Sequence, residues 1–239
     1  GESPTVKNIQ KVYVAKFSFL PLRFIERFFV FFMARLFGYR NFYSHYGYLS
    51  ALIAAIFGRL YFWHCEMRGE YECSDCVSSN VLVDRPFRKI LKKCYRLVTC
   101  TELMKEYYGF KFNVDKKKIL VMPNWVDINK KLPAAKKEDA ILFLHWLSPR
   151  KGSRVLPDIF EKIAAEAPKT KFIVAGEGPD FEWLKSEFKN KGLKVEMPGA
   201  VPNKDVLKLF AKVKLFINPS REEEFGRVLI EAMAAKVPL

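Results

Sequence analysis

The sequence lacks any run of about 18 uninterrupted apolar residues, the length that a membrane-spanning helix requires. It also lacks the features of a secretory signal peptide. These absences favour a soluble, cytoplasmic protein. Because the chain begins with glycine instead of methionine and ends at Val-Pro-Leu, where a further strand should start, we interpret it as a fragment.

Cysteine is scarce, with five residues in 239, and the number is odd. Without a secretory signature, this composition argues against a disulfide framework. Cys73 and Cys76 form a single CxxC pair, with His64 and Cys65 just upstream, but no second CxxC accompanies them. We therefore expect reduced thiols in a loop, and a zinc site on these four side chains is the less favoured alternative.

Negative charge is in deficit, since 41 Lys and Arg face 26 Asp and Glu for a net charge of +15. Most of the excess falls in residues 1–130. This excess positive charge can bind nucleic acid, an anionic membrane surface or an anionic substrate, or it can belong to a solvated lysine-rich surface that binds no partner. No nucleic-acid-binding module is recognisable and the aromatic residues follow core patterns, so nucleic acid is the least favoured partner.

The first 130 residues alternate between strand and helix patterns. Thr101 is placed to cap one of the helices, and residues 65–83 have loop composition. The helix expected over Pro21 to Phe37 has an aromatic face with three arginines, so it either covers a sheet or lies in a membrane interface to reach a lipid-linked acceptor. We predict strands over 12–20, 41–45, 60–64, 97–100 and 119–122, and helices over 21–37, 47–58, 85–94 and 102–108.

A polar, lysine-rich segment over 131–139 predicts a linker between an N-terminal domain, 1–130, and a C-terminal domain, 140–239. Strands separated by single helices imply parallel pairing with right-handed crossovers. Pro179 suits the first turn of a helix, Gly192 its end, and Asn203 the cap of the next helix. We predict strands over 140–145, 171–175, 193–197 and 214–218, and helices over 153–166, 180–190, 203–212 and 226–235.

The segment from Leu215 to Leu239 carries the most informative motif. A short apolar strand ends at Asn-Pro-Ser, and Gly226 opens a helix. Glu223 lies in the loop ahead of that helix, and Glu231 follows eight positions later. At such a strand, loop and helix, free backbone N–H groups and the helix dipole attract a negatively charged ligand.

This segment resembles the sugar-nucleotide signature of family-four glycosyltransferases of the two-Rossmann-domain (GT-B) type, with two glutamates in E-x7-E spacing. The resemblance implies an α/β fold of two Rossmann-like domains, both incomplete in this chain. It also implies that Glu223 contacts donor-sugar hydroxyls and that Glu231 holds the ribose hydroxyls, for which a carboxylate is a suitable acceptor. Ser220, Phe225 and Gly226 belong to the same signature and are expected at the donor.

A second motif, Ser148-Pro-Arg-Lys-Gly152, lies between the first C-terminal strand and its helix. The resemblance assigns Lys151 to the donor diphosphate, where its charge stabilises the leaving group. The alternative is a solvated lysine at a helix start. The family usually has Gly-Arg ahead of this loop, whereas this chain has His145 and Trp146.

Three arginines are candidates to replace the missing guanidinium: Arg150, Arg221 and Arg227. Arg227 can instead form an ion pair with Glu231 four residues later. Glu224, where the family commonly has glycine, either contacts sugar hydroxyls or faces solvent.

Two weaker matches complete the set. Gly176-Glu177-Gly178 resembles a family turn near the nucleotide base, although a tight strand-to-helix connection explains it equally well. His64 resembles the histidine that the family places at its interdomain cleft, in a catalytic or substrate-orienting role, and the alternative is a structural histidine. His45 has a similar but weaker claim.

Together the motifs predict a retaining glycosyltransferase that moves a hexose-type sugar from a nucleoside-diphosphate donor to a glycan or lipid-linked acceptor. No metal or other cofactor is expected, since no Asp-x-Asp motif occurs. The alternatives are a non-catalytic sugar-nucleotide-binding module and, less favoured, a nucleic-acid-binding protein. The location is cytoplasmic, with peripheral contact at the inner face of the membrane as an option. Catalytic candidates are Glu223, Lys151 and His64, and donor-binding candidates are Glu231, Phe225, Gly226, Arg150, Gly176, Glu177, Gly178 and Ser220.

Overall fold

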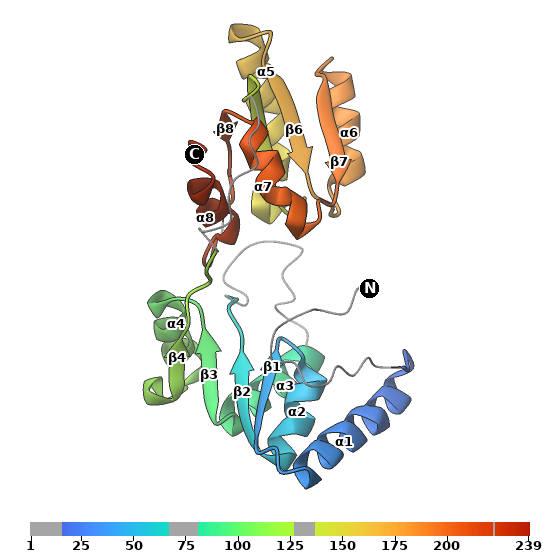
Figure 1. Cartoon of the computed structure of the whole chain (residues 1–239), viewed down its shortest axis with the longest axis vertical. Coiled ribbons are helices and arrows are strands. Elements are labelled where there is room, and N and C mark those ends of the chain that lie inside the picture. Colours follow the sequence, from blue (N-terminus) through green and yellow to red (C-terminus); the bar gives the residue numbers. More distant parts are fainter. Residues whose placement is uncertain (1–15, 67–80, 127–136, 222) are drawn as a thin grey trace. The chain divides into compact units, whose positions relative to one another are not determined.

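The computed structural model describes residues 16–66, 81–126, 137–221 and 223–239. The chain forms two compact units (Figure 1). Unit 1 holds the described residues up to Glu66 and those from 81 to Met122, and unit 2 holds those from Pro123 to Leu239. Within the described residues, no helix is both long enough and apolar enough to cross a membrane. Most of the predicted linker, 131–139, lies outside the described residues, so the domain limits stay a prediction.

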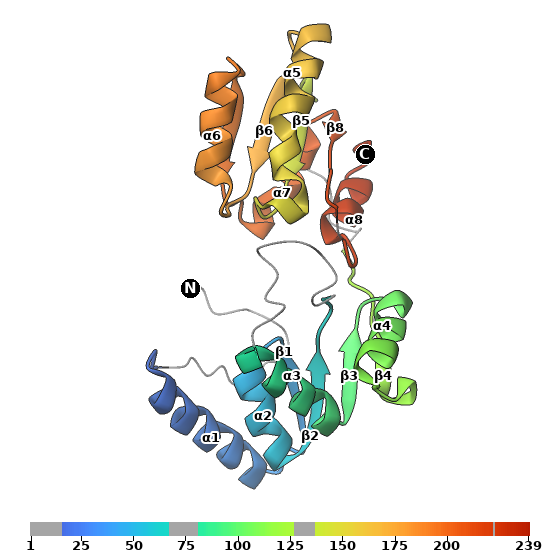
Figure 2. The same ribbon diagram turned by 180° about the vertical axis from the view of Figure 1, so that it is seen from behind.

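Unit 1 is a parallel four-stranded sheet with its strands in sequence order, β1-β2-β3-β4. Alternating apolar residues make these strands, and Phe62, Leu60 and Leu97 are fully buried. The strands are β1 (Asn41–His45), β2 (Arg59–Trp63), β3 (Arg96–Thr99) and β4 (Ile119–Val121). The helices are α1 (Leu20–Leu36), α2 (Tyr48–Phe57), α3 (Val81–Lys93) and α4 (Glu102–Phe112), with a short 3-10 turn η1 (Lys116–Lys118) (Figure 2).

The predicted strand over 12–20 is wrong in its described part, because residues 16–19 form no regular element and α1 already begins at Leu20. The carboxylate of Glu26 accepts the backbone N–H of Lys16 at 2.7 Å, which ties the preceding segment to the helix instead of to a sheet. The helix predicted from Arg85 begins four residues earlier, at Val81. Thr101 is confirmed as a cap, since its side chain accepts the backbone N–H of Met104 at 3.1 Å.

Unit 2 is a second parallel sheet with the order β7-β6-β5-β8. Its strands are β5 (Ala140–Leu144), β6 (Lys171–Ala175), β7 (Val195–Gly199) and β8 (Leu215–Phe216). Its helices are α5 (Leu156–Glu166), α6 (Phe181–Asn190), α7 (Asn203–Lys212) and α8 (Arg227–Ala234), with 3-10 turns η2 (Pro149–Lys151) and η3 (Ser153–Val155).

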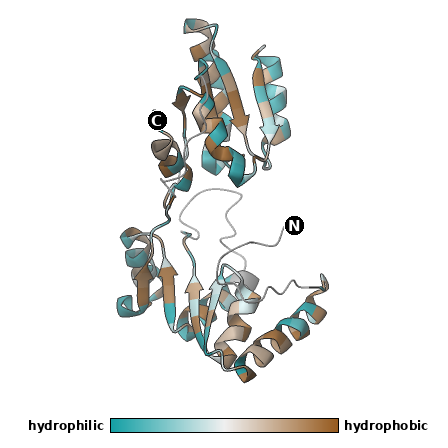
Figure 3. Cartoon of the chain, in the orientation of Figure 1, coloured by the Kyte–Doolittle hydropathy of each residue, from teal (hydrophilic) through white to brown (hydrophobic). Residues whose placement is uncertain are grey.

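Both faces of this second sheet are covered. On one face Leu142 packs with Phe210 of α7 and Ala232 of α8, and on the other Phe143 packs with Phe160 of α5 and Phe188 of α6. A strand with both faces buried needs apolar residues throughout, and Figure 3 shows this along β6. The α/β fold class predicted from the sequence is confirmed.

Details at the helix ends of unit 2 differ from the predictions. Asn203 is not a cap, because Pro202 occupies that position and Asn203 is already the first helical residue. Pro179 lies just before α6, whose cap is Asp180, and β7 begins at Val195 instead of residue 193. Gly192 does follow the end of α6, with a φ of +66° that favours glycine.

The strand order creates a switch point between β5 and β8. From β5 the chain moves outward through β6 and β7, and then returns to place β8 on the other side of β5. The connections after β5 and β8 therefore leave the sheet in opposite directions, and open α/β sheets bind ligands outside the carboxyl ends of strands at such a point.

Candidate functional site

A pocket of about 300 Å³ lies at this switch point in unit 2. Glu223 and Glu231, the two glutamates of the E-x7-E motif, both line it. The other lining residues come from the end of β5, the start of α7 and the start of α8: Leu144, His145, Val201, Asn203, Val206, Arg227 and Val228. The motif therefore presents its carboxylates to one cavity.

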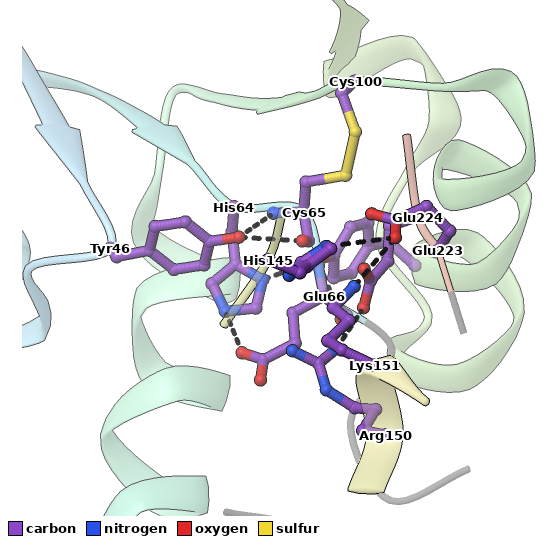
Figure 4. Close-up of polar contacts among 11 residues, drawn as sticks. Tyr46, His64, Cys65, Glu66, Cys100, His145, Arg150, Lys151, Glu223 and Glu224 are labelled. Carbon is purple, nitrogen blue, oxygen red and sulfur yellow. Dashed lines mark hydrogen bonds and ion pairs between the residues drawn. A yellow bond between two sulfur atoms is a disulfide. The ribbon is translucent and has the colours of Figure 1, made fainter. Parts of the chain in front are cut away.

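Glu223 receives two donors on a single carboxylate oxygen (Figure 4). Its Oε2 lies 3.1 Å from Nζ of Lys151 and 3.4 Å from Nε2 of His145. Burial raises the pKa of this carboxyl, but the hydrogen bond from His145 and the charge and hydrogen bond of Lys151 outweigh that effect and lower the pKa from 4.5 to about 2. Glu223 is therefore an ionised acceptor at neutral pH.

The orientation of His145 follows from its other ring nitrogen. The backbone N–H of Trp146 donates to Nδ1 of His145 at 2.8 Å. A neutral imidazole that accepts at Nδ1 carries its proton on Nε2, and that nitrogen can donate to Glu223. Sequence reasoning registered His145 only as a departure from the family pattern. A histidine directly after the strand that ends at the switch point is the signal that could have placed it in the site.

Lys151 is buried, with 4% of its side chain exposed, so the alternative of a solvated lysine is wrong. Its position depends on the loops after β5 and β8. Gly152 ends η2 with a φ of +76°, and a Cβ there would lie 2.2 Å from the carbonyl oxygen of Pro219. This close approach holds the loop that carries Lys151 against the loop that leads to Glu223.

The arginines near the pocket have acidic partners. Arg150 lies 3.4 Å from Glu224, so that carboxylate is paired instead of facing solvent alone. Nε of Arg227 lies 3.1 Å from Oε1 of Glu231, which confirms the ion pair within α8. Arg221 is exposed, and its backbone N–H donates to the carbonyl of Arg150. Which of the three replaces the family's arginine stays open.

Close packing explains the glycine turn after β6. Gly176 has a φ of +133°, and a Cβ there would lie 1.9 Å from the carbonyl oxygen of His145. Gly178 approaches Leu147 in the same way, and the carbonyl of Glu177 accepts the N–H of Leu147 at 2.8 Å. The tight-connection alternative is thus supported, and the proposed contact with a base stays a prediction.

The remaining residues of the signature lie around the start of α8. Gly226 is the N-cap with a φ of +67°, and Phe225 is half-buried beside it. The Ser220 hydroxyl donates to the side chain of Asn218 at 2.8 Å. Their donor contacts stay predictions.

His64 belongs to unit 1 and is fully buried. Its Nδ1 lies 2.5 Å from the hydroxyl of Tyr108, and its Nε2 lies 3.3 Å from that of Tyr48. Nε2 also lies 3.7 Å from the carboxylate of Glu66 (Figure 4). This network supports the structural alternative, because an enclosed ring has no open face for a substrate. His45 is exposed and stacks on Trp63 at 4.4 Å.

The expectation of reduced thiols is wrong for Cys65 and Cys100, which form a disulfide. They follow β2 and β3, which are adjacent in the sheet, so folding brings together residues that are 35 positions apart. The bond also removes Cys65 from the zinc alternative, while Cys73 and Cys76 lie outside the described residues. Among the residues that the structure does describe, no group of three or more His, Cys, Asp or Glu could hold a metal.

Comparison with protein families identifies the C-terminal part of the chain. Residues 126–239 match the family described as glycosyl transferases group 1. This segment belongs to the group 1 glycosyltransferases. The glycosyltransferase segment includes the pocket, both glutamates, Lys151 and His145.

Curated relatives support the same assignment. A phosphatidylinositol N-acetylglucosaminyltransferase gpi3 subunit from Schizosaccharomyces pombe is 31% identical over 123 residues, which cover 48% of this chain and 27% of that protein. A 2-deoxystreptamine N-acetyl-D-glucosaminyltransferase from Niallia circulans is 33% identical over 101 residues, which cover 41% of this chain and 26% of the relative. The glycosyltransferase match thus spans about a quarter of the length of each relative.

Solved structures extend the likeness of the fold across both units. HepE from Anabaena, in complex with UDP and glucose, has a TM-score of 0.71 at 18% identity, covering 91% of this chain and 61% of that one. TarM has a TM-score of 0.67 at 20% identity, covering 83% and 40%. The likeness covers the parallel α/β sheets of both units, and the two-Rossmann GT-B fold predicted from the sequence is confirmed.

Proposed function

We propose that this protein transfers a sugar from a nucleoside-diphosphate donor to a glycan or lipid-linked acceptor, with retention of the anomeric configuration. The observation that carries this proposal is the placement of Glu223 and Glu231 in one pocket at the switch point of unit 2. A sugar nucleotide has a hydroxyl-rich group at each end and a diphosphate between them. The pocket has a carboxylate for each end and a lysine close to one of them.

In this proposal Glu231 accepts hydrogen bonds from the ribose hydroxyls and Glu223 from the donor sugar. The low pKa of Glu223, about 2, suits this role, because an ionised carboxylate accepts from two vicinal hydroxyls. Lys151 and the N-terminal end of α8 at Gly226 stabilise the negative charge that develops on the diphosphate as the bond to the sugar breaks. His145 contacts the same carboxylate oxygen of Glu223 as Lys151 does and helps to hold it in place.

The relatives suggest which donor to test first. Proteins from both Schizosaccharomyces pombe and Niallia circulans are named as N-acetylglucosaminyltransferases, and the HepE complex contains UDP. We therefore propose UDP-N-acetylglucosamine as the first donor for screening, ahead of GDP and ADP sugars. A phosphatidylinositol acceptor in the name of one relative supports the lipid-linked class of acceptor.

We also propose that α1 places unit 1 at a membrane interface. One side of α1 packs on the rest of the unit, with the rings of Phe28 and Phe57 4.9 Å apart. Another side leaves large apolar residues exposed, including Ile25 at 52% and Phe29 at 58%. Arginines lie along the same helix, which is the composition of a helix that binds at an anionic interface: Arg23, Arg27 and Arg35.

Replacing the proposed ribose-binding carboxylate tests the donor pocket. Glu231→Ala should weaken UDP binding by about tenfold, because the ribose loses a charge-assisted hydrogen-bond acceptor. Isothermal titration calorimetry measures the affinity. Glu182→Ala is the matched control, since it removes the same charge from an exposed position on α6 that does not line the pocket. Unchanged affinity in Glu231→Ala, or equal losses in both variants, would contradict the proposed ribose contact.

A non-catalytic sugar-nucleotide-binding module is the second candidate. It is favoured by Trp146, which stands where the family usually has an arginine and is 56% exposed. An indole cannot neutralise a diphosphate. Such a module would bind UDP-sugar without releasing UDP in a donor-hydrolysis assay, whereas a transferase would release it slowly even without an acceptor.

A further inference from the structure

A second pocket lies in unit 1, at the amino-terminal edge of its sheet. It has a volume of about 510 Å³ and is lined by residues where β2 and β3 begin, just ahead of β4. Figure 1 draws these strand starts as the tails of the β2 and β3 arrows. Parallel α/β sheets bind their substrates at the carboxyl edge, which is the opposite edge. This pocket is therefore separate from any acceptor site of the usual kind and from the donor pocket of unit 2.

Five cationic side chains line this pocket: Arg59, Lys92, Lys93, Arg96 and Lys118. They come from the starts of two strands, the last turn of α3 and the residue before β4. Among the described residues, no ion pair joins any of the five to a carboxylate. The folding of the sheet thus gathers positive charge into one cavity, and the described residues that line it include no acid. A bound anion would neutralise this charge.

The aromatic ring of Tyr95 organises the two arginines. The guanidinium carbon of Arg59 lies 5.0 Å from the ring centroid, and that of Arg96 lies 5.4 Å from it. Arg96 also donates a hydrogen bond to the carbonyl of Lys117. Guanidinium groups held in this way lose less freedom when they bind a phosphate oxygen.

Ordinary stabilisation accounts for only part of this cluster. Lys92 and Lys93 complement the negative end of the α3 dipole, which requires no ligand. That effect does not explain Arg59, Arg96 or Lys118, which belong to the strand starts. The volume also falls in the range of ligand-binding cavities, about 300 to 1,000 Å³.

We propose that this pocket binds a ligand with at least two phosphate groups. Five cations exceed what a single phosphate needs, and arginine and lysine together suit phosphate oxygens. The shared chemistry is a diphosphate or two adjacent phosphates, either on a soluble molecule or on a lipid headgroup. This site is independent of the sugar donor.

Nuclear magnetic resonance titration of the full chain with inorganic pyrophosphate tests the proposal. Saturable shifts are expected for the backbone amides of Leu60, Tyr95 and Arg96, which lie in the pocket. Amides of unit 2, such as Val228, report any binding in the donor pocket separately. The double variant Lys92→Gln/Lys93→Gln should weaken binding at the first set of amides about tenfold or more.

Lys185→Gln/Lys189→Gln is the matched control, because it removes the same charge from exposed positions on α6. Vesicles of phosphatidylcholine with and without phosphatidylinositol 4,5-bisphosphate, whose headgroup carries several phosphates, distinguish the two sources. If the ligand is a headgroup, the pocket variant binds the bisphosphate vesicles less tightly than the control variant, and if it is soluble, the two variants bind equally. The proposal would be overturned if pyrophosphate caused no saturable shifts and the pocket and control variants bound the vesicles equally. It would also be overturned if the control variant weakened pyrophosphate binding as much as the pocket variant.

Discussion

At the scale of residues, the donor pocket depends on one carboxylate with two donors. Glu223 is held by Lys151 and His145, which come from the loop after β5, while Glu223 itself comes from the loop after β8. Each contact favours the charged form of the acid. The pKa of about 2 means that Glu223 gives no proton at neutral pH and acts as an acceptor.

The low pKa predicts how stability depends on pH. Because the folded pKa lies below the ordinary 4.5, the contacts of Glu223 stabilise the fold above pH 4.5, and this contribution is lost as the pH falls toward 2. It amounts to about 3.5 kcal/mol at most, from about 1.4 kcal/mol for each pKa unit between 4.5 and about 2. Denaturant unfolding of wild type and Glu223→Gln across this range should show a stability difference that narrows with acid.

Glu182→Gln, at an exposed position on α6, is the control for removing one negative charge. Its unfolding should follow the wild type across the same pH range. Parallel curves for wild type and Glu223→Gln would contradict the proposed ionic contacts of Glu223.

At the scale of elements, the site depends on how two loops fit together. The loop after β5 meets the loop after β8 at Gly152, whose missing side chain leaves room for Pro219. The turn after β6 approaches His145 in the same way through Gly176. The backbone of three strand ends thus fixes the positions of the polar side chains between them.

Two glycines with similar φ angles allow the cost of backbone strain to be measured separately from the cost of close packing. Gly152→Ala meets both penalties, with φ at +76° and a carbonyl oxygen 2.2 Å from the new Cβ. Gly192→Ala, with φ at +66° and nothing within 4 Å, meets only the first. We expect about 1 kcal/mol of destabilisation for Gly192→Ala and about 2 to 4 kcal/mol for Gly152→Ala, measured by denaturant unfolding. Equal losses of stability in the two variants would mean that the loops after β5 and β8 can move apart at no cost in free energy, which would contradict the close packing at Gly152.

Local patterns predicted most of the strands and helices, because the apolar periodicity of 140–235 and the cap at Thr101 are properties of short segments. The family resemblance carried by the E-x7-E motif implied that both carboxylates contact one donor, and the structure shows that both glutamates line one pocket. The contacts that local patterns did not predict form between residues that only the folded sheet brings together. The disulfide of Cys65 and Cys100 and the contact of His145 with Glu223 join segments far apart in sequence, so no local pattern contains them.

At the scale of the whole molecule, charge and exposed apolar surface favour association with anionic membranes. The chain carries a net charge of +15, and α1 presents aromatic and aliphatic residues without a covering element among the described residues. In the proposed association, the cations attract an anionic surface and the apolar residues of α1 then insert into it. Salt should weaken the first step and leave the second largely unchanged.

Vesicle flotation tests this association. Ile25→Ser/Phe29→Ser removes apolar surface from α1 and should weaken binding to anionic vesicles about tenfold or more, since each side chain contributes about 1.5 to 3 kcal/mol when fully buried. Leu103→Ser/Phe110→Ser is the matched control on α4, where these residues are 64% and 91% exposed. Binding that falls equally in both variants, or in neither, would refute a specific role for α1.

The ion pair between Lys151 and Glu223 has a consequence for turnover under the proposed donor geometry. When the diphosphate binds Lys151, the ion pair between Lys151 and Glu223 weakens. The carboxylate of Glu223 then gains more free energy from hydrogen bonds with the sugar hydroxyls, so binding of the diphosphate and binding of the sugar strengthen each other. After the sugar has been transferred, the nucleoside diphosphate still binds Lys151, but Glu223 has lost its hydrogen bonds with the sugar hydroxyls. When the nucleoside diphosphate dissociates, the ion pair between Lys151 and Glu223 forms again, and this favours product release.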